Sequence, residues 1–242
     1  MEMGNKLIVG ILIVVIIVVV AYLGIGSSGA TVSATGESDI EVQPDLVSVY
    51  LNLQTKNVSS VDAKDALDSI SEDVQIALLR LGLDRKDIQM QSYNIYQEYD
   101  WSNGQRKENG FVASQQIVVK TEDFDLTADI VDVAIDNGAL VSWINFELSD
   151  EKQKEYKIQA LEEAGKDAKT KAEATASGLG KKIGALVSVQ SQDFNYGPYR
   201  YFESGFADGV NSVEVKEAAL NIAPKDVNVR ATISVQYKLR NF

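Results

Sequence analysis

Hydrophobic positions follow different patterns along the chain, and the first is an unbroken run of nineteen uncharged residues at 7–25. A helix of that length, at about 1.5 Å per residue, measures about 28 Å and matches the hydrocarbon core of a bilayer. The run is longer than the apolar core of about 7–15 residues in a cleavable signal peptide, so it predicts a retained membrane anchor. The small residues Ser28-Gly29-Ala30 keep cleavage open as an alternative.

Charges on either side of this run predict its orientation. Lys6 precedes it and acidic residues follow it, so the positive-inside rule places the N-terminus in the cytoplasm. The sequence therefore predicts four parts: cytoplasmic residues 1–6, a single membrane-spanning anchor at 7–25, a linker at 26–30 and an extracytoplasmic domain at 31–242.

In the first half of the domain, apolar and polar residues alternate at 47–54, which predicts a strand with one apolar face. A helical period then runs from Ser59 or Ser60 to Gly82, where glycine ends the pattern. Two further strands are predicted at 88–99 and 111–121, joined by a turn at 100–110 that contains Gly and Asn.

The second half passes through a similar order of elements after a short helix at 124–137. The patterns predict strands at 141–148, 183–190 and 227–239, with a long helix at 150–177 between the first two. We interpret this order as a duplication with pseudo-repeats 31–122 and 123–242. The predicted fold class is α+β, an ectodomain of two strand-helix-strand-strand repeats with the helices packed on one sheet face.

The polar face of the predicted sheet is mostly uncharged. Its members are Asn52, Gln54, Gln89, Gln91, Thr232, Ser234 and Gln236. A solvated face is the simple interpretation. The alternative is contact with another subunit or a shared cavity, because burying neutral polar groups costs less than burying charges.

Alanines recur at every fourth position of the long helix, at 160, 164, 168, 172 and 176. Such a row of small side chains allows a close approach of two backbones. We expect it to pack against the sheet of the same chain, and packing against a neighbouring helix is the alternative.

Aromatic residues gather in two places of the predicted repeat, and they are the candidate interaction residues. They are Tyr93, Tyr96, Tyr99, Trp101, Phe194, Tyr196, Tyr199, Tyr201, Phe202 and Phe206. The second group lies in a connection of about 35 residues, which is unusually long for a loop without structure. Tyr-rich loops suit recognition, while local packing over the open end of the sheet is the alternative.

Composition excludes several classes of function. The formal net charge of −12 argues against a nucleic-acid partner, because such binding relies on clustered Lys and Arg. The chain has no His and no Cys, which removes the Ser-His-Asp and Cys-His systems, histidine-ligated metals and disulfides. We therefore assign no catalytic residue, no cofactor and no metal site, and expect a protein that is not an enzyme.

Four stretches together resemble the SIMPL-domain family. They are Val32-Ser33-Ala34-Thr35-Gly36 with Val42-Gln43-Pro44-Asp45; Gly110-Phe111-Val112-Ala113-Ser114; residues 141–146 followed by Ser149-Asp150 and the alanine row; and Pro224 leading into Val229, Ala231, Val235 and Tyr237. This family includes bacterial periplasmic immunogenic and oxidative-stress-related proteins. The resemblance implies an extracytoplasmic, often oligomeric α+β domain, without an established reaction, cofactor or substrate.

Two functions are expected from these observations. The first is a non-enzymatic protein, anchored in the bilayer through 7–25, that self-assembles into a homo-oligomer and acts in cell-envelope structure or stress-related interaction. An envelope protein is a further candidate partner. The alternative is a monomeric ligand-binding or signalling adaptor at the membrane surface.

Overall fold

The computed structural model describes residues 29–102, 105–203 and 224–241. The predicted cytoplasmic segment and the anchor at 7–25 lie outside these residues. Of the helices that the structure does describe, none combines the length and the apolar character needed to cross a bilayer. The described residues divide into two compact units: a larger one of residues 38–102, 105–160, 194–203 and 224–231, and a smaller one of residues 29–37, 161–193 and 232–241.

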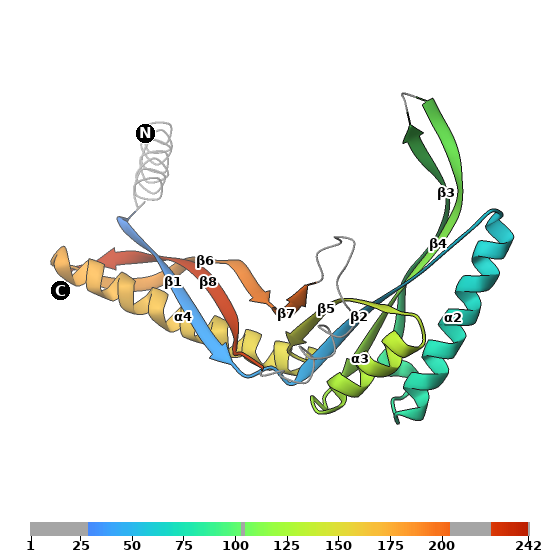
Figure 1. Ribbon diagram of the computed structural model, residues 1–242. Coiled ribbons are helices and arrows are strands. Elements are labelled where there is room, and N and C mark those ends of the chain that lie inside the picture. Colours follow the sequence, from blue (N-terminus) through green and yellow to red (C-terminus); the bar gives the residue numbers. More distant parts are fainter. Residues whose placement is uncertain (1–28, 103–104, 204–223, 242) are drawn as a thin grey trace, which may run out of the picture. The chain divides into compact units, whose positions relative to one another are not determined.

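The described part is a mixture of helices and antiparallel strands, which confirms the predicted mixed class (Figure 1). The strands are β1 (Thr31–Val42), β2 (Leu46–Asn57), β3 (Ile88–Ser102), β4 (Gln105–Thr121), β5 (Leu140–Glu147), β6 (Lys182–Gly197), β7 (Tyr199–Glu203) and β8 (Val227–Arg240). The helices are α2 (Ser60–Arg80), α3 (Leu126–Asp136) and α4 (Asp150–Gly178), with a 3-10 turn at Arg85–Asp87.

The strands form two separate sheets, whereas the sequence analysis predicted a single sheet with the helices packed on one face. Five strands are ordered β3-β4-β2-β5-β7, and three are ordered β1-β8-β6. The difference arises in the second half, where β5 pairs with β2 while β6 and β8 belong to the other sheet. Each compact unit draws on both halves of the chain, so the duplication stays a prediction based on element order.

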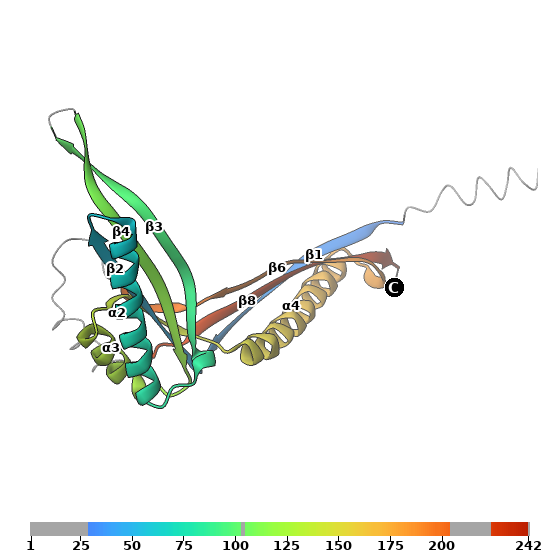
Figure 2. The same cartoon turned by 90° about the vertical axis from the view of Figure 1, so that its right-hand side faces the viewer.

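In the larger unit, α2 and α3 cover one face of the five-stranded sheet (Figure 2). Leu51 of β2 lies opposite Ile117 of β4, and both belong to the buried core with Leu67 of α2. Helix α2 begins where the Ser59 hydroxyl accepts the Asp62 N–H at 3.1 Å. It ends before Gly82, whose φ of 95° is accessible to glycine at little cost.

The turn predicted at 100–110 is wrong, because β3 and β4 remain paired as far as Ser102 and Gln105. Opposite charges stabilise this outer part of the hairpin: Asp100 lies across from Lys107. The connection predicted as a long loop is also partly strand, since β6 continues to Gly197 and β7 pairs with β5. In both places cross-strand pairing outweighs the local turn signals.

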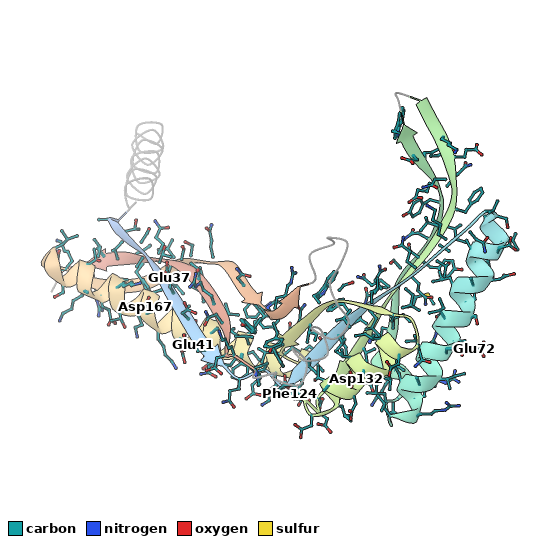
Figure 3. The ribbon with its side chains drawn as sticks, viewed as in Figure 1. Glu37, Glu41, Glu72, Phe124, Asp132 and Asp167 are labelled. Carbon is teal, nitrogen blue, oxygen red and sulfur yellow. The ribbon has the colours of Figure 1, made fainter. Side chains whose placement is uncertain are left out.

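In the smaller unit, α4 packs very closely against β1. Ala164 and Ala168 are fully buried, and a Cβ atom built on Gly36 would lie 2.1 Å from the Ala164 carbonyl oxygen. Beside them the Glu37 N–H donates to Asp167 at 2.9 Å (Figure 3). The alanine row therefore packs against the strands of its own chain, which confirms the expectation of core packing.

Replacing Gly36 with Ala tests this close approach. The added methyl group would overlap the α4 backbone, with 2.1 Å to Ala164 O and 2.2 Å to Ala168 N. We expect Gly36→Ala to lower the free energy of unfolding by about 3 kcal/mol, the upper part of the range for overpacked cores. Urea unfolding followed by circular dichroism measures the change. Gly178→Ala is the matched control, because nothing lies within 4 Å of its added Cβ. Equal stability of the two variants would contradict the packing.

Candidate functional site

Tyr199 and Tyr201, from the second aromatic group, pack inside the larger unit. Both rings contact Phe146, at centroid distances of 6.5 and 6.0 Å, and both lie against the hydrophobic core. Phe194 is half-buried, with the Lys157 ammonium 5.0 Å from its ring centroid. The Phe202 side chain and all of Phe206 lie outside the described residues. These tyrosines therefore contribute packing over the sheet.

Tyr196, also from that group, belongs to a hydrogen-bonded junction. Its hydroxyl oxygen accepts the Leu148 N–H at 2.6 Å, and burial raises the pKa of Tyr196 to about 12. Next along the chain, Ser149 donates its N–H and its hydroxyl to the two Asp45 oxygens, each at 2.7 Å. The Pro44-Asp45 and Ser149-Asp150 stretches of the family resemblance thus meet, and they fix the start of α4.

The first aromatic group lies on β3 and is more exposed. The Tyr93 hydroxyl donates to Asp68 of α2 at 3.0 Å. The pKa of Tyr93 is raised, mainly by burial and to a smaller extent by the neighbouring Asp68 carboxylate. The Arg106 guanidinium covers the Tyr99 ring at 3.5 Å. Tyr96 and Trp101 are 51% and 71% exposed, so they are the freest aromatic side chains of the group.

Residues 88–97 of β3 form an edge of the five-stranded sheet without a single charged side chain. We call this segment the β3 edge. Besides the tyrosines it exposes Met90 and Ile95, which the sequence analysis did not select. Hydrophobic exposure on a strand with unpaired outward N–H and C=O groups is typical of a surface that pairs with another strand.

Residues 183–192 of β6 form a second such segment, the β6 edge, at the margin of the three-stranded sheet. It also lacks charges, and it exposes Leu186, Val187 and Val189 by about half each. The run of uncharged residues is visible in the sequence. What sequence reasoning could not show is that both runs lie at sheet edges.

The other two sheet edges carry charges. β1 has Glu37, Asp39 and Glu41 along its length. β7 is only five residues long and contains Arg200 and Glu203. Short length and charge are the usual means by which proteins prevent edge pairing. Among the strands that the structure describes, two edges are therefore protected against pairing by charge or short length, and two are not.

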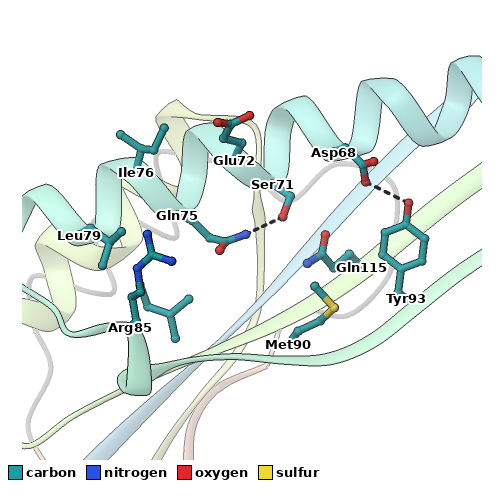
Figure 4. A pocket seen from close by; sticks show the side chains of 11 residues that line it. Asp68, Ser71, Glu72, Gln75, Ile76, Leu79, Arg85, Met90, Tyr93 and Gln115 are labelled. Atoms are coloured by element: carbon teal, nitrogen blue, oxygen red, sulfur yellow. Dashed lines mark hydrogen bonds between the residues drawn. The ribbon is translucent and has the colours of Figure 1, made fainter.

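A groove of about 520 Å³ runs between α2 and β3 (Figure 4). Its lining residues are Asp68, Ser71, Glu72, Gln75, Ile76, Leu79, Arg85, Ile88, Met90, Tyr93 and Gln115. Gln115 lies in the groove wall with only 1% of its surface exposed, and its side-chain nitrogen has no hydrogen-bond partner. A buried donor without an acceptor costs about 1–3 kcal/mol, so this groove is suited to a ligand that supplies an oxygen.

Electrostatics at the groove are mixed. The Lys64 ammonium donates to Asp68 at 2.6 Å, and this bond together with that from Tyr93 lowers the pKa of Asp68. Arg85 lines the groove as well. Throughout the ranges that the structure describes, no group of three or more carboxylates is placed to hold a metal ion.

Comparison with known proteins gives one family. Residues 32–237 match the family model described as "SIMPL: Protein of unknown function (DUF541)". The chain is also 25% identical over 173 residues to "Uncharacterized protein YggE" of Escherichia coli strain K12, covering 70% of this chain and 69% of that protein. The proteins of the same name from Escherichia coli O157:H7 and Shigella flexneri match to the same extent. The family resemblance seen in the sequence is therefore confirmed.

Tyr196 gives a pH-dependent test of its junction. Its pKa is about 12 in the folded chain against the ordinary 10.0, so the unfolded chain loses this proton first. The stabilisation that depends on the neutral Tyr196 hydroxyl is therefore fully present below pH 10 and is lost as the pH rises toward 12.

Tyr196→Phe should lower the free energy of unfolding by about 1 kcal/mol at pH 8, because the Leu148 N–H loses its acceptor. Between pH 10 and 12 the Tyr196→Phe variant should lose less stability than the parent chain, because it has no hydroxyl to ionise at this position. Urea unfolding at pH 8, 10 and 11.5 measures both effects. Parallel curves for the two chains would argue against this role.

Proposed function

Because the chain belongs to the SIMPL family, whose biochemical role is open, we propose its function from the surfaces it exposes. The protein is a non-enzymatic, membrane-anchored extracytoplasmic protein that self-assembles into a homo-oligomer. It acts in cell-envelope structure or in stress-related interaction. The observation that carries the proposal is the pair of uncharged, partly apolar sheet edges at 88–97 and 183–192.

Charge supports a second copy as the partner. A formal net charge of −12 makes two copies repel each other over most of their surfaces. The β3 and β6 edges have no charged side chain, so contact there buries no like charges. Backbone hydrogen bonds between edge strands then add affinity without any special side chain.

The predicted anchor at 7–25 supports the same function. A helix of that length, with the N-terminus in the cytoplasm, would hold every copy on the outer side of one membrane. Confinement to a surface raises the effective concentration of the copies and favours weak contacts between them. An envelope protein with an open sheet edge is a further partner of the same kind.

Lysine substitutions at the two edges test self-assembly. Asn94→Lys and Val187→Lys each place a charge in the middle of an exposed edge, where pairing would bury it. We expect the Kd for self-association of the double variant to be at least tenfold higher than that of the parent chain. Burying an unpaired charge at the contact should cost at least about 1.4 kcal/mol of binding free energy, which corresponds to a factor of ten in Kd. Light scattering on a sizing column, with the full chain in mild detergent, measures the mass.

Val58→Lys is the matched control, because it adds the same charge at an 86% exposed position outside both edges. This variant should keep the mass of the parent chain. A parent chain that is strictly monomeric over micromolar concentrations would contradict self-assembly.

A monomeric ligand-binding adaptor is the second candidate, and the groove between α2 and β3 favours it. The unpartnered Gln115 nitrogen and the apolar side chains of Ile76 and Met90 offer one hydrogen-bond donor in a partly apolar site. The fitting ligand is a small molecule with an apolar body and an oxygen acceptor.

Gln115→Met tests the groove. Removing the unpaired buried donor should raise the free energy of unfolding of the unliganded chain by about 1 kcal/mol. The variant should also lose any stabilisation that a panel of neutral metabolites gives the parent chain, since binding raises stability as ln(1 + [L]/Kd). Thermal unfolding measures both, with Gln54→Met, at an exposed position outside the groove and both edges, as control. A variant less stable than the parent chain would show that Gln115 is paired in solution.

A further inference from the structure

We propose that the β6 edge of one copy pairs with the β3 edge of a second copy, so that residues 183–192 lie beside the groove under α2. The inference rests on the proposed self-assembly and names the surfaces that meet. It joins two segments of equal length, ten residues each, that are both uncharged and both lie at sheet edges.

A single kind of contact then accounts for both exposed edges. Pairing of β3 with β3, or of β6 with β6, would cover one edge and leave the other open to further pairing. Pairing of β3 with β6 uses one of each per contact, and every copy offers one of each. Because one kind of contact then covers both open edges, β3–β6 pairing is favoured over β3–β3 and β6–β6 pairing.

The two edges differ in shape in a way that suits them to each other. The β3 edge borders a groove whose wall includes Ile76, Leu79 and Met90. On the β6 edge, apolar side chains are exposed on both faces of the strand. A strand added beside β3 turns alternate side chains toward α2, where they fill the groove.

The face of β6 that enters the groove follows from α4. On β8, Val235 and Ala231 are buried and Ile233 lies 3.9 Å from the Cβ position of Gly165, so α4 covers that face. Gln236 points to the opposite face, and Ser188 donates to it at 3.4 Å. The face of Ser188 is therefore free of α4 and can accept α2 of the second copy.

This orientation turns polar side chains toward the groove that Gln115 lines. Leu186, Ser188 and Gln190 share one face of β6, so they turn together toward the groove. The hydroxyl oxygen of Ser188 and the amide oxygen of Gln190 then bring acceptors into the groove, whose wall includes the unpaired Gln115 nitrogen. Val187 and Val189 face the other way, on the side of Ser92, Asn94 and Tyr96.

An unlike pair of surfaces has a consequence for the assembly. Contacts between two different patches are head to tail, so they close into a ring or continue as a filament.

Disulfide trapping tests the pairing, because the chain has no cysteine of its own. One copy carries Ser92→Cys or Asn94→Cys, and the other carries Val187→Cys or Val189→Cys, in the full chain in mild detergent. After mild oxidation, at least one of the four mixtures should form covalent dimers more than tenfold above a mixture containing Val58→Cys. Neither variant alone should dimerise, and a chain carrying both cysteines should give a ladder beyond the dimer on a non-reducing gel.

The orientation has its own control. Ser188→Cys lies on the opposite face of β6 and should not cross-link with Ser92→Cys. Efficient cross-linking of that pair would overturn the assigned face, and disulfides within one chain or between identical variants would overturn the unlike pairing. Light scattering on the same samples separates the two proposals. An oligomer without any mixed cross-link rejects only the β3–β6 contact, whereas a monomer rejects self-assembly as well.

Discussion

An open β-sheet ends in two strands whose outward N–H and C=O groups have no partner in the sheet, and this constraint governs what the protein can do. Proteins normally charge, shorten or cover such strands. Here β1 carries three acidic residues and β7 has five residues, whereas 88–97 and 183–192 are long and uncharged. Leaving these two edges open invites association, so their retention in an acidic chain argues for a surface that pairs with another strand.

The packing of α4 explains why the β6 edge stays uncovered. Gly36 has no side chain and the residues facing it are alanines, so strand and helix backbones meet directly. These short side chains keep α4 close to β1 and β8, and Val187 and Val189 of β6 remain about half exposed. Larger residues in the row would lift α4 away from β1 at the cost of this contact. The same small side chains that hold the helix down thus leave β6, at the far margin of the sheet, partly exposed.

Sequence reasoning predicted the elements well because their signals are local. The helix after Ser59, its glycine stop at Gly82 and the alanine row follow from periodicity and capping. It failed where pairing decides, as in the hairpin beyond Tyr99, where Asp100 and Lys107 pair across the strands in place of a turn. The candidate site was found only in part: tyrosines attract notice anywhere, but Met90 and Leu186 gain meaning only from an edge position that emerges from strand order.

Gln115 connects the two candidate functions. A glutamine with 1% exposure and an unpaired nitrogen destabilises an isolated chain, and methionine of similar size would avoid that cost. Its presence is understandable if the working state supplies an acceptor. A strand from a second copy and a small ligand would both enter the groove between α2 and β3, so they would compete for it. Ligand binding would then oppose assembly by mass action, and the groove would couple the two in a single site.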